Sequence, residues 1–298
     1  MVKLAETSKM EAMTNFIVPI DFSVDSLKGL KWAILFSKKQ TINVQMVYVL
    51  TNSTNFQPHV VEQEHEYAET QFKKLVKEFS PQLGNQSKLR YIIKKGKVYR
   101  EVVNQADSYK NAVVSASTHG ASGFEELFIG SNAMKIMAAT EQPVYTLRTM
   151  VPDDVKKIVV PVKLEVNTRQ KAPFAAELAE LFGAELHVII LSTTSNKRDL
   201  TRLEAYSNQM VNYFKARNLN TVAKTLVGDN MSALTCNYAE AVNADLITVM
   251  SNEKDKWNIF LGSYLHQMVN SAPVPLLSIT PKEKQIPTGF MTFGGYKE

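Results

Sequence analysis

The segment NFIVPI, residues 15–20, recurs later in the chain as KIVVPV, residues 157–162. Each copy is a short apolar run, which is the composition of a buried strand. The same order of elements follows both copies: helix, strand, long polar helix, strand, helix, strand, helix and a short last strand. Strands that alternate with helices are typical of βαβ units in a parallel sheet. The repeat therefore predicts two tandem α/β domains, each a doubly wound, five-stranded parallel sheet.

The elements of the two copies are predicted from apolar periodicity and from the glycines and prolines that interrupt it. The predicted helices are 26–39 and 169–182, then 62–79 and 198–216; the predicted strands are 44–50 and 186–191, 89–96 and 221–228, and the closing pair 143–147 and 275–279. The domains span 15–149 and 155–281, with residues 1–14 predicted to be disordered. The tail, 282–298, carries four aromatic or proline side chains, so we expect it to pack on the body: Pro287, Phe290, Phe293 and Tyr296.

Composition excludes several classes of protein. The chain has 298 residues and a formal net charge of +5, with lysines scattered among acids, and this predicts no nucleic-acid surface. No apolar run approaches the roughly 20 residues that a membrane helix needs, so no membrane association is expected. The N-terminus lacks the apolar core of a signal peptide, and Cys236 is the single cysteine. These features predict a cytoplasmic protein.

A loop in the first copy has the composition of a phosphate site. The apolar run at 112–116 leads into Ser117-Thr118-His119-Gly120, and Gly130-Ser131-Asn132 then opens an amphipathic helix. Unpaired N–H groups at a helix start and the helix dipole favour an anion, and glycine allows the backbone to approach it closely. The spacing matches neither the G-x-G-x-x-G dinucleotide motif nor the P-loop.

These residues together resemble the universal stress protein family in its tandem two-domain form, from about Asn15 to Pro281. The resemblance implies a strand order of 3-2-1-4-5 and a ligand crevice between the first and fourth strands. It also implies ATP or ADP as the ligand, with magnesium as a candidate companion ion. The implied nucleotide-binding residues are Pro19, Asp21 and Val49 at the base and ribose, and Ser117, His119, Gly120, Gly130, Ser131 and Asn132 around the ribose and phosphates.

The two copies differ at the implied site. Ser117 stands where the family's nucleotide-binding pattern has glycine, a departure that predicts either weaker binding or an added hydrogen bond. In the second copy Lys163 replaces Asp21, and Ser251-Asn252-Glu253-Lys254 replaces the first copy's glycine loop. We expect Lys163 and Glu253 to pair and to close the second pocket, which leaves one nucleotide per chain.

Plainer interpretations remain beside these. Asp21 and Ser131 could only cap helices, and His119 could be a surface residue. No catalytic constellation or metal site is evident, so we expect a regulatory switch, with at most slow ATP hydrolysis or autophosphorylation on Ser131. The alternative is a nucleotide-free interaction scaffold in which both sites are degenerate.

The family resemblance further implies that the closing strands pair as an intramolecular pseudo-dimer, which would cover two exposed sheet edges. A homodimer and an unidentified protein partner are also expected.

Overall fold

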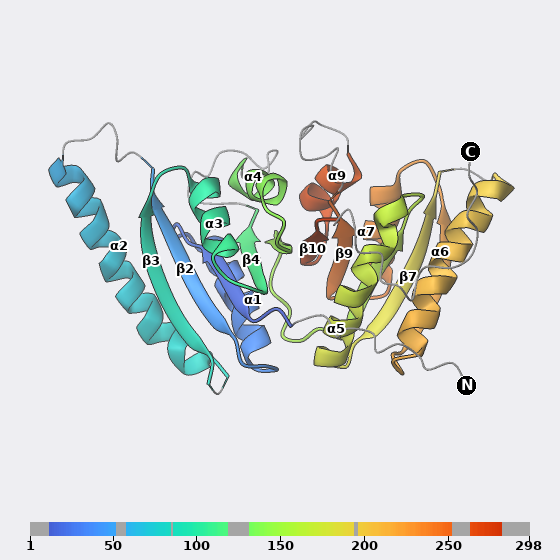
Figure 1. The fold of residues 1–298 in the computed structure, drawn as a ribbon, viewed down its shortest axis with the longest axis horizontal. Helices are drawn as coiled ribbons and strands as arrows, with labels where there is room; N and C mark the ends of the chain where they lie inside the picture. The colour runs from blue at the N-terminus through green and yellow to red at the C-terminus, as the bar shows by residue number, and fades with distance from the viewer. Residues whose placement is uncertain are drawn as a thin grey trace.

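A computed structural model describes residues 12–51, 58–84, 86–118, 131–193, 196–251 and 263–281, without the side chains of Ser131 and Val166. The two halves of the chain lie side by side (Figure 1). The strands are β1 (Asn15–Pro19), β2 (Asn43–Leu50), β3 (Lys88–Lys95), β4 (Ala112–Ser117), β5 (Val144–Leu147), β6 (Lys157–Val162), β7 (Glu185–Ser192), β8 (Thr221–Val227), β9 (Leu246–Met250) and β10 (Leu276–Ile279).

Helices cover both faces of these strands. The helices are α1 (Ser26–Ser37), α2 (Pro58–Phe79), α3 (Val98–Asp107), α4 (Ser131–Ala139), α5 (Ala172–Phe182), α6 (Lys197–Lys215), α7 (Met231–Ala241) and α9 (Tyr264–Ser271), with short 3₁₀ turns η1 (Ser80–Gln82) and η2 (Val166–Lys171). One apolar core is shared by residues of α1, α2, α5 and α6, and a second core by residues of α3, α4, α7 and α9. The predicted doubly wound α/β class is confirmed.

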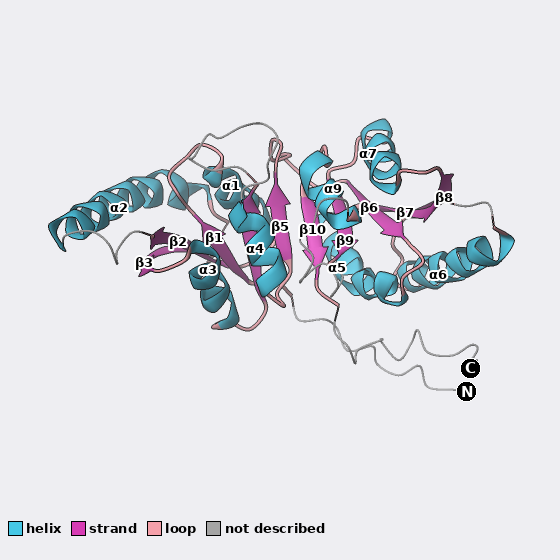
Figure 2. Cartoon of the chain, turned by 90° about the horizontal axis from the view of Figure 1, so that it is seen from above, coloured by secondary structure: helices cyan, strands magenta, loops and turns pink. Residues whose placement is uncertain are grey.

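All ten strands form one sheet in the order β3-β2-β1-β4-β5-β10-β9-β6-β7-β8. The first half therefore has the predicted order 3-2-1-4-5, and the second half repeats it from the other end. Figure 2 shows the strands as one continuous row, with β5 and β10 at its middle. Strands buried on both faces need apolar side chains throughout, and Phe16, Ile17 and Val18 of β1 are all buried.

The junction between the two halves is antiparallel. Leu276, Leu277 and Ser278 pair with Thr146, Tyr145 and Val144, respectively. The predicted pairing of the two closing segments is confirmed, and it removes one exposed edge from each half. The ring centroids of Phe36, on α1, and Phe182, on α5, lie 4.9 Å apart, so the first core continues across the junction.

Two predicted helix starts are wrong, and proline explains both. The second helix of the first half begins at Pro58, not at Glu62, because proline suits the first helical position, where its missing N–H is not needed. In the second half, the residues from Arg169 to Lys171 belong to η2, and the α-helix begins at Ala172 with Pro173 in its first turn. Met13 is buried in the first core, two residues before the expected domain start.

The predicted tail packing concerns residues 282–298, which lie outside the described residues. No helix in the described ranges is both long and apolar enough to cross a lipid bilayer.

Candidate functional site

The order of the strands brings distant parts of the first half to one edge of the sheet. β1 pairs on one side with β2 and on the other with β4, all in parallel. Pro19 is paired with Val47, so Val49, two residues further along β2, lies at the same carboxyl edge. Asp21 follows the end of β1, and Ser117 ends β4. Such an edge, where the strand order reverses, is where ligands bind in open α/β sheets.

Asp21 begins a tight turn. Its Oδ1 accepts hydrogen bonds from the backbone N of Ser23 at 3.0 Å and from Ser23 Oγ at 2.5 Å. Phe22, between them, has a φ of +64°, a left-handed conformation that is uncommon for a bulky side chain. Asp21 is exposed and lies just beyond the carboxyl end of β1.

The start of α1 distinguishes Asp21 from a simple helix cap. The backbone N of Ser26 donates to Ser23 Oγ at 3.1 Å, so Ser23 supplies the side-chain cap. Asp25, the residue directly before the helix, makes no such cap bond and instead pairs with Lys28 at 2.5 Å. Asp21 thus contributes to the cap of α1 indirectly, by accepting hydrogen bonds from Ser23.

An aromatic cluster that sequence reasoning missed adjoins this turn. The ring of Phe22 lies 5.0 Å from those of Tyr48 and Phe72 and 6.0 Å from that of Tyr67. The Tyr48 hydroxyl donates to Glu64 Oε1 at 2.9 Å, and burial followed by this contact raises the pKa of Tyr48. The position of Phe22 directly after Asp21 was the available signal. The cluster connects the turn to α2.

The phosphate side of the predicted site is described only in part. Ser117 is half-buried at the end of β4, and the backbone N of Thr118 donates to the carbonyl of Leu147 at 3.2 Å. His119, Gly120 and Gly130 lie outside the described residues. The helix that was predicted to follow is present as α4, and its apolar face is buried as expected: Ala133, Ile136 and Met137. Asn132, in the first turn of α4, is exposed.

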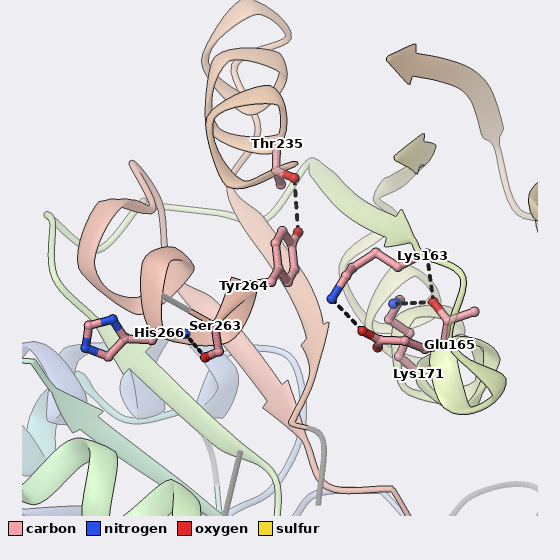
Figure 3. A network of polar contacts seen from close by, with 8 residues as sticks. Lys163, Glu165, Lys171, Thr235, Ser263, Tyr264 and His266 are labelled. Atoms are coloured by element: carbon pink, nitrogen blue, oxygen red, sulfur yellow. Dashed lines mark hydrogen bonds and ion pairs between the residues drawn. The ribbon is translucent and has the colours of Figure 1, made fainter. Parts of the chain in front are cut away.

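The equivalent edge of the second half is occupied by lysines. Lys163, directly after β6, places its Nζ 2.6 Å from Glu165 Oε1 and 4.3 Å from the centroid of the Tyr264 ring (Figure 3). The predicted partner, Glu253, lies outside the described residues. Glu165 was not predicted from the sequence as the partner of Lys163. The available signal for this pair was their spacing of two residues within one loop.

A second lysine lies beneath this pair. Lys171, the last residue of η2, is 2 % exposed, and its Nζ donates to Thr168 Oγ1 at 3.2 Å. Burial, followed by repulsion from Lys163, lowers the pKa of Lys171 to about 7, with Glu165 acting in the opposite direction. From the sequence, Lys171 was predicted to lie in the helix 169–182, and no pattern indicated that its side chain would be buried.

Metal ligands do not cluster in the part of the chain that the structure describes. No group of three or more His, Cys, Asp or Glu side chains there could hold a metal ion. His59 and His65 are both exposed on α2.

Comparisons with known proteins identify the family. The profile of the universal stress protein family matches residues 13–148 and again residues 154–279. Among solved structures, a universal stress protein from Archaeoglobus fulgidus DSM 4304 is 18% identical with a TM-score of 0.74, over 92% of this chain and 98% of that one. A search of curated proteins found no match.

Two further structures share the fold. A putative universal stress protein from Pseudomonas aeruginosa UCBPP-PA14 is 13% identical with a TM-score of 0.66, over 91% of this chain and 94% of that one. A functionally unknown protein from Pseudomonas aeruginosa PAO1 is 14% identical with a TM-score of 0.63, over 91% of this chain and 93% of that one. With two family domains in a row and this topology, the chain belongs to the universal stress protein family.

Proposed function

We propose that this chain binds one adenine nucleotide, ATP or ADP, in its first domain and acts in the cytoplasm as a regulatory switch of the stress response. The observation that carries the proposal is the asymmetry between the two carboxyl edges. The first presents an exposed carboxylate, Asp21, on a tight turn. The second has Lys163 directly after β6, at the corresponding position, and the buried Lys171 acts on it from η2.

The chemistry of each edge agrees with this assignment. A carboxylate accepts hydrogen bonds from ribose hydroxyls, as acidic residues do in other nucleotide sites of α/β sheets. The N–H groups of the first turn of α4 have no partner within that helix and suit phosphate oxygens. Magnesium would neutralise phosphate charge if it accompanies ATP. At the second edge, the cation of Lys163 already has a carboxylate and an aromatic ring as partners.

A switch requires a nucleotide to bind two conformations with different affinities. The turn at Asp21 is a suitable origin, because Phe22 packs directly against residues of α2. A nucleotide that reorients Asp21 would move Phe22, and with it the contact between the turn and α2. We propose α2 as the element that reports occupancy of the site.

Calorimetric titration with ATP and magnesium tests the assignment. We expect a stoichiometry near one, abolished by Gly130→Glu, because a carboxylate at the start of α4 repels phosphate. In the second copy, Gly262-Ser263 stands where the first copy has Gly130-Ser131. Gly262→Glu is therefore the matched control and should leave the stoichiometry near one. A stoichiometry of two, or loss of binding in the control alone, would contradict the assignment to the first domain.

A nucleotide-free scaffold is the second candidate, and the half-buried Ser117 favours it. A side chain there reduces the room that the family's glycine provides at this position. If no heat is measured and no nucleotide is released from the denatured protein, the scaffold is the better description. Ser117→Gly would then be expected to restore binding.

Intact mass after incubation with ATP tests autophosphorylation, which a mass without added phosphate rules out.

A further inference from the structure

The second domain contains a buried excess of positive charge that the nucleotide site does not use. The Lys163 ammonium pairs with the Glu165 carboxylate, and Lys171 is near enough for both charges to act on its pKa (Figure 3). Within the described residues, Glu165 is the one carboxylate that acts on Lys171. When both lysines are charged, the described part of this cluster holds two ammonium groups and one carboxylate. A buried charge is costly unless it is paired.

Lys171 has hydrogen-bonding capacity to spare. An ammonium group carries three N–H donors. In the part of the chain that the structure describes, Thr168 Oγ1, at 3.2 Å, is its hydrogen-bond partner. Thr168 also accepts from the backbone N of Lys163 at 3.2 Å, so this hydroxyl lies between the two lysines. Buried N–H donors that lack acceptors destabilise the folded state, so a ligand that offers an acceptor to Lys171 would stabilise it.

Among the residues that the structure describes, Lys163 and Glu165 are the charges that act on Lys171. η2 packs against the apolar strand β9 and against α6, where its Arg169 donates to Gln209 and lies over the Tyr206 ring. On the side of α9, Tyr264 lies against Lys163, and its hydroxyl contacts Thr235 Oγ1 at 3.0 Å. Burial raises the pKa of Tyr264, so it stays neutral.

Glu165 is the most exposed member of the cluster. Its side chain is 29% exposed, against 16% for Lys163, and it belongs to the short loop between β6 and η2. A carboxylate on such a loop can move away while both lysines stay in place, since Lys163 follows β6 directly and Lys171 is held in η2. Glu165 is therefore in the position that a small anion from solution would take.

We propose that Lys163 and Lys171 form a binding site for a small oxyanion, for which the Glu165 carboxylate substitutes in this conformation. The ligand class is a compact anion with oxygen acceptors, either a phosphate-like tetrahedral group or a carboxylate. The site lies where β6 and β9 meet, the switch point of the second sheet half. It requires neither an adenine base nor the first domain, so it stands independently of the proposed nucleotide site.

Proton uptake accompanies binding at this site. An anion favours the charged form of Lys171, whose pKa is about 7 in its absence. Below that pH the ammonium is already present, and above it binding must also take up a proton. Affinity is therefore expected to fall by about tenfold per pH unit above neutrality.

Calorimetric titration of the full chain with sodium sulfate, in a buffer without oxyanions, tests the proposal. Sulfate is a suitable probe because it does not titrate near neutrality. At about pH 6, where Lys171 is charged, wild type should show saturable binding. Glu165→Gln, which removes the competing carboxylate, should bind sulfate roughly tenfold or more tightly. Lys163→Met and Lys171→Met should each abolish saturable binding, with circular dichroism confirming that the variants are folded.

Three controls make the outcome decisive. Gly130→Glu, in the first domain, should leave the sulfate affinity unchanged, which excludes the nucleotide site as the source of the heat. Sodium chloride at equal ionic strength should give no saturable signal. Sodium acetate distinguishes the two ligand types: a tighter fit for sulfate indicates a phosphate-like ligand, and a tighter fit for acetate indicates a carboxylate. Absence of saturable binding to both anions in Glu165→Gln, or binding that survives in Lys171→Met, would overturn the proposal.

Discussion

The buried amine of Lys171 makes a prediction about how stability depends on pH. Burial lowers its pKa from 10.5 to about 7. Between these two values the unfolded chain holds a proton on Lys171 that the folded chain lacks. Stability therefore rises with pH across this range, because a lower proton concentration disfavours the unfolded state, which holds the extra proton. Replacing Lys171 with methionine, which is similar in length and apolar, removes this dependence.

The magnitude follows from the two pKa values. When one proton separates the two states, the free energy of unfolding changes by about 1.4 kcal/mol per pH unit. With the full slope, the free energy of unfolding would change by almost 3 kcal/mol from about pH 7 to pH 9. At about pH 7 Lys171 is still half protonated in the folded state, and this reduces the change to about 2 kcal/mol. Lys171 is 2 % exposed, so solvent screens this effect little.

Urea unfolding at the two pH values, in a buffer without oxyanions, measures the effect. The difference in the free energy of unfolding between Lys171→Met and wild type should shift by about 2 kcal/mol between about pH 7 and pH 9, in favour of wild type at the higher pH. Lys38→Met, at an exposed lysine just after α1, is the matched control and should show no such shift. Parallel pH profiles for wild type and Lys171→Met would refute the reasoning, since they would mean that Lys171 titrates alike in both states.

Three further changes test the packing and the turn. Gly29→Ala should destabilise the protein by about 1–3 kcal/mol in urea unfolding, because the new Cβ would lie 2.4 Å from the carbonyl O of Ser115; wild-type stability would contradict this packing. Ser23→Ala should cost about 1 kcal/mol through loss of the cap on Ser26, and an unchanged unfolding midpoint would argue against that cap. Tyr145→Phe should be neutral or stabilising by up to about 1 kcal/mol, because among the described residues its buried hydroxyl has no hydrogen-bond partner; a clear loss of stability would show that a partner exists.

The pairing of the two halves was predicted from the repeat together with the family resemblance. A closing strand at each copy's end leaves two similar edges, and joining them satisfies backbone groups that would otherwise be exposed. The structure pairs residues 144–146 with residues 276–278 as expected. The approximate helix and strand ranges were also predictable, since apolar periodicity is local information. The exact residues at which helices begin were harder to predict, as α2, which starts at Pro58, and α5, with Pro173 in its first turn, illustrate.

The sequence by itself determined the two α/β domains, because apolar strands, repeats and the rules of parallel sheets are local or topological properties. The strand order that brings Asp21 and Ser117 to one edge was predicted from the family resemblance. Only the tertiary structure decided that Phe22 connects the Asp21 turn to α2 and that Glu165 pairs with Lys163. It alone decided that Lys171 is buried. Lysine is usually exposed, and no local pattern in the sequence indicates that η2 packs against β9 and α6. Burial and charge pairing depend on which distant segments come together, and this is why they appear only once the chain is folded.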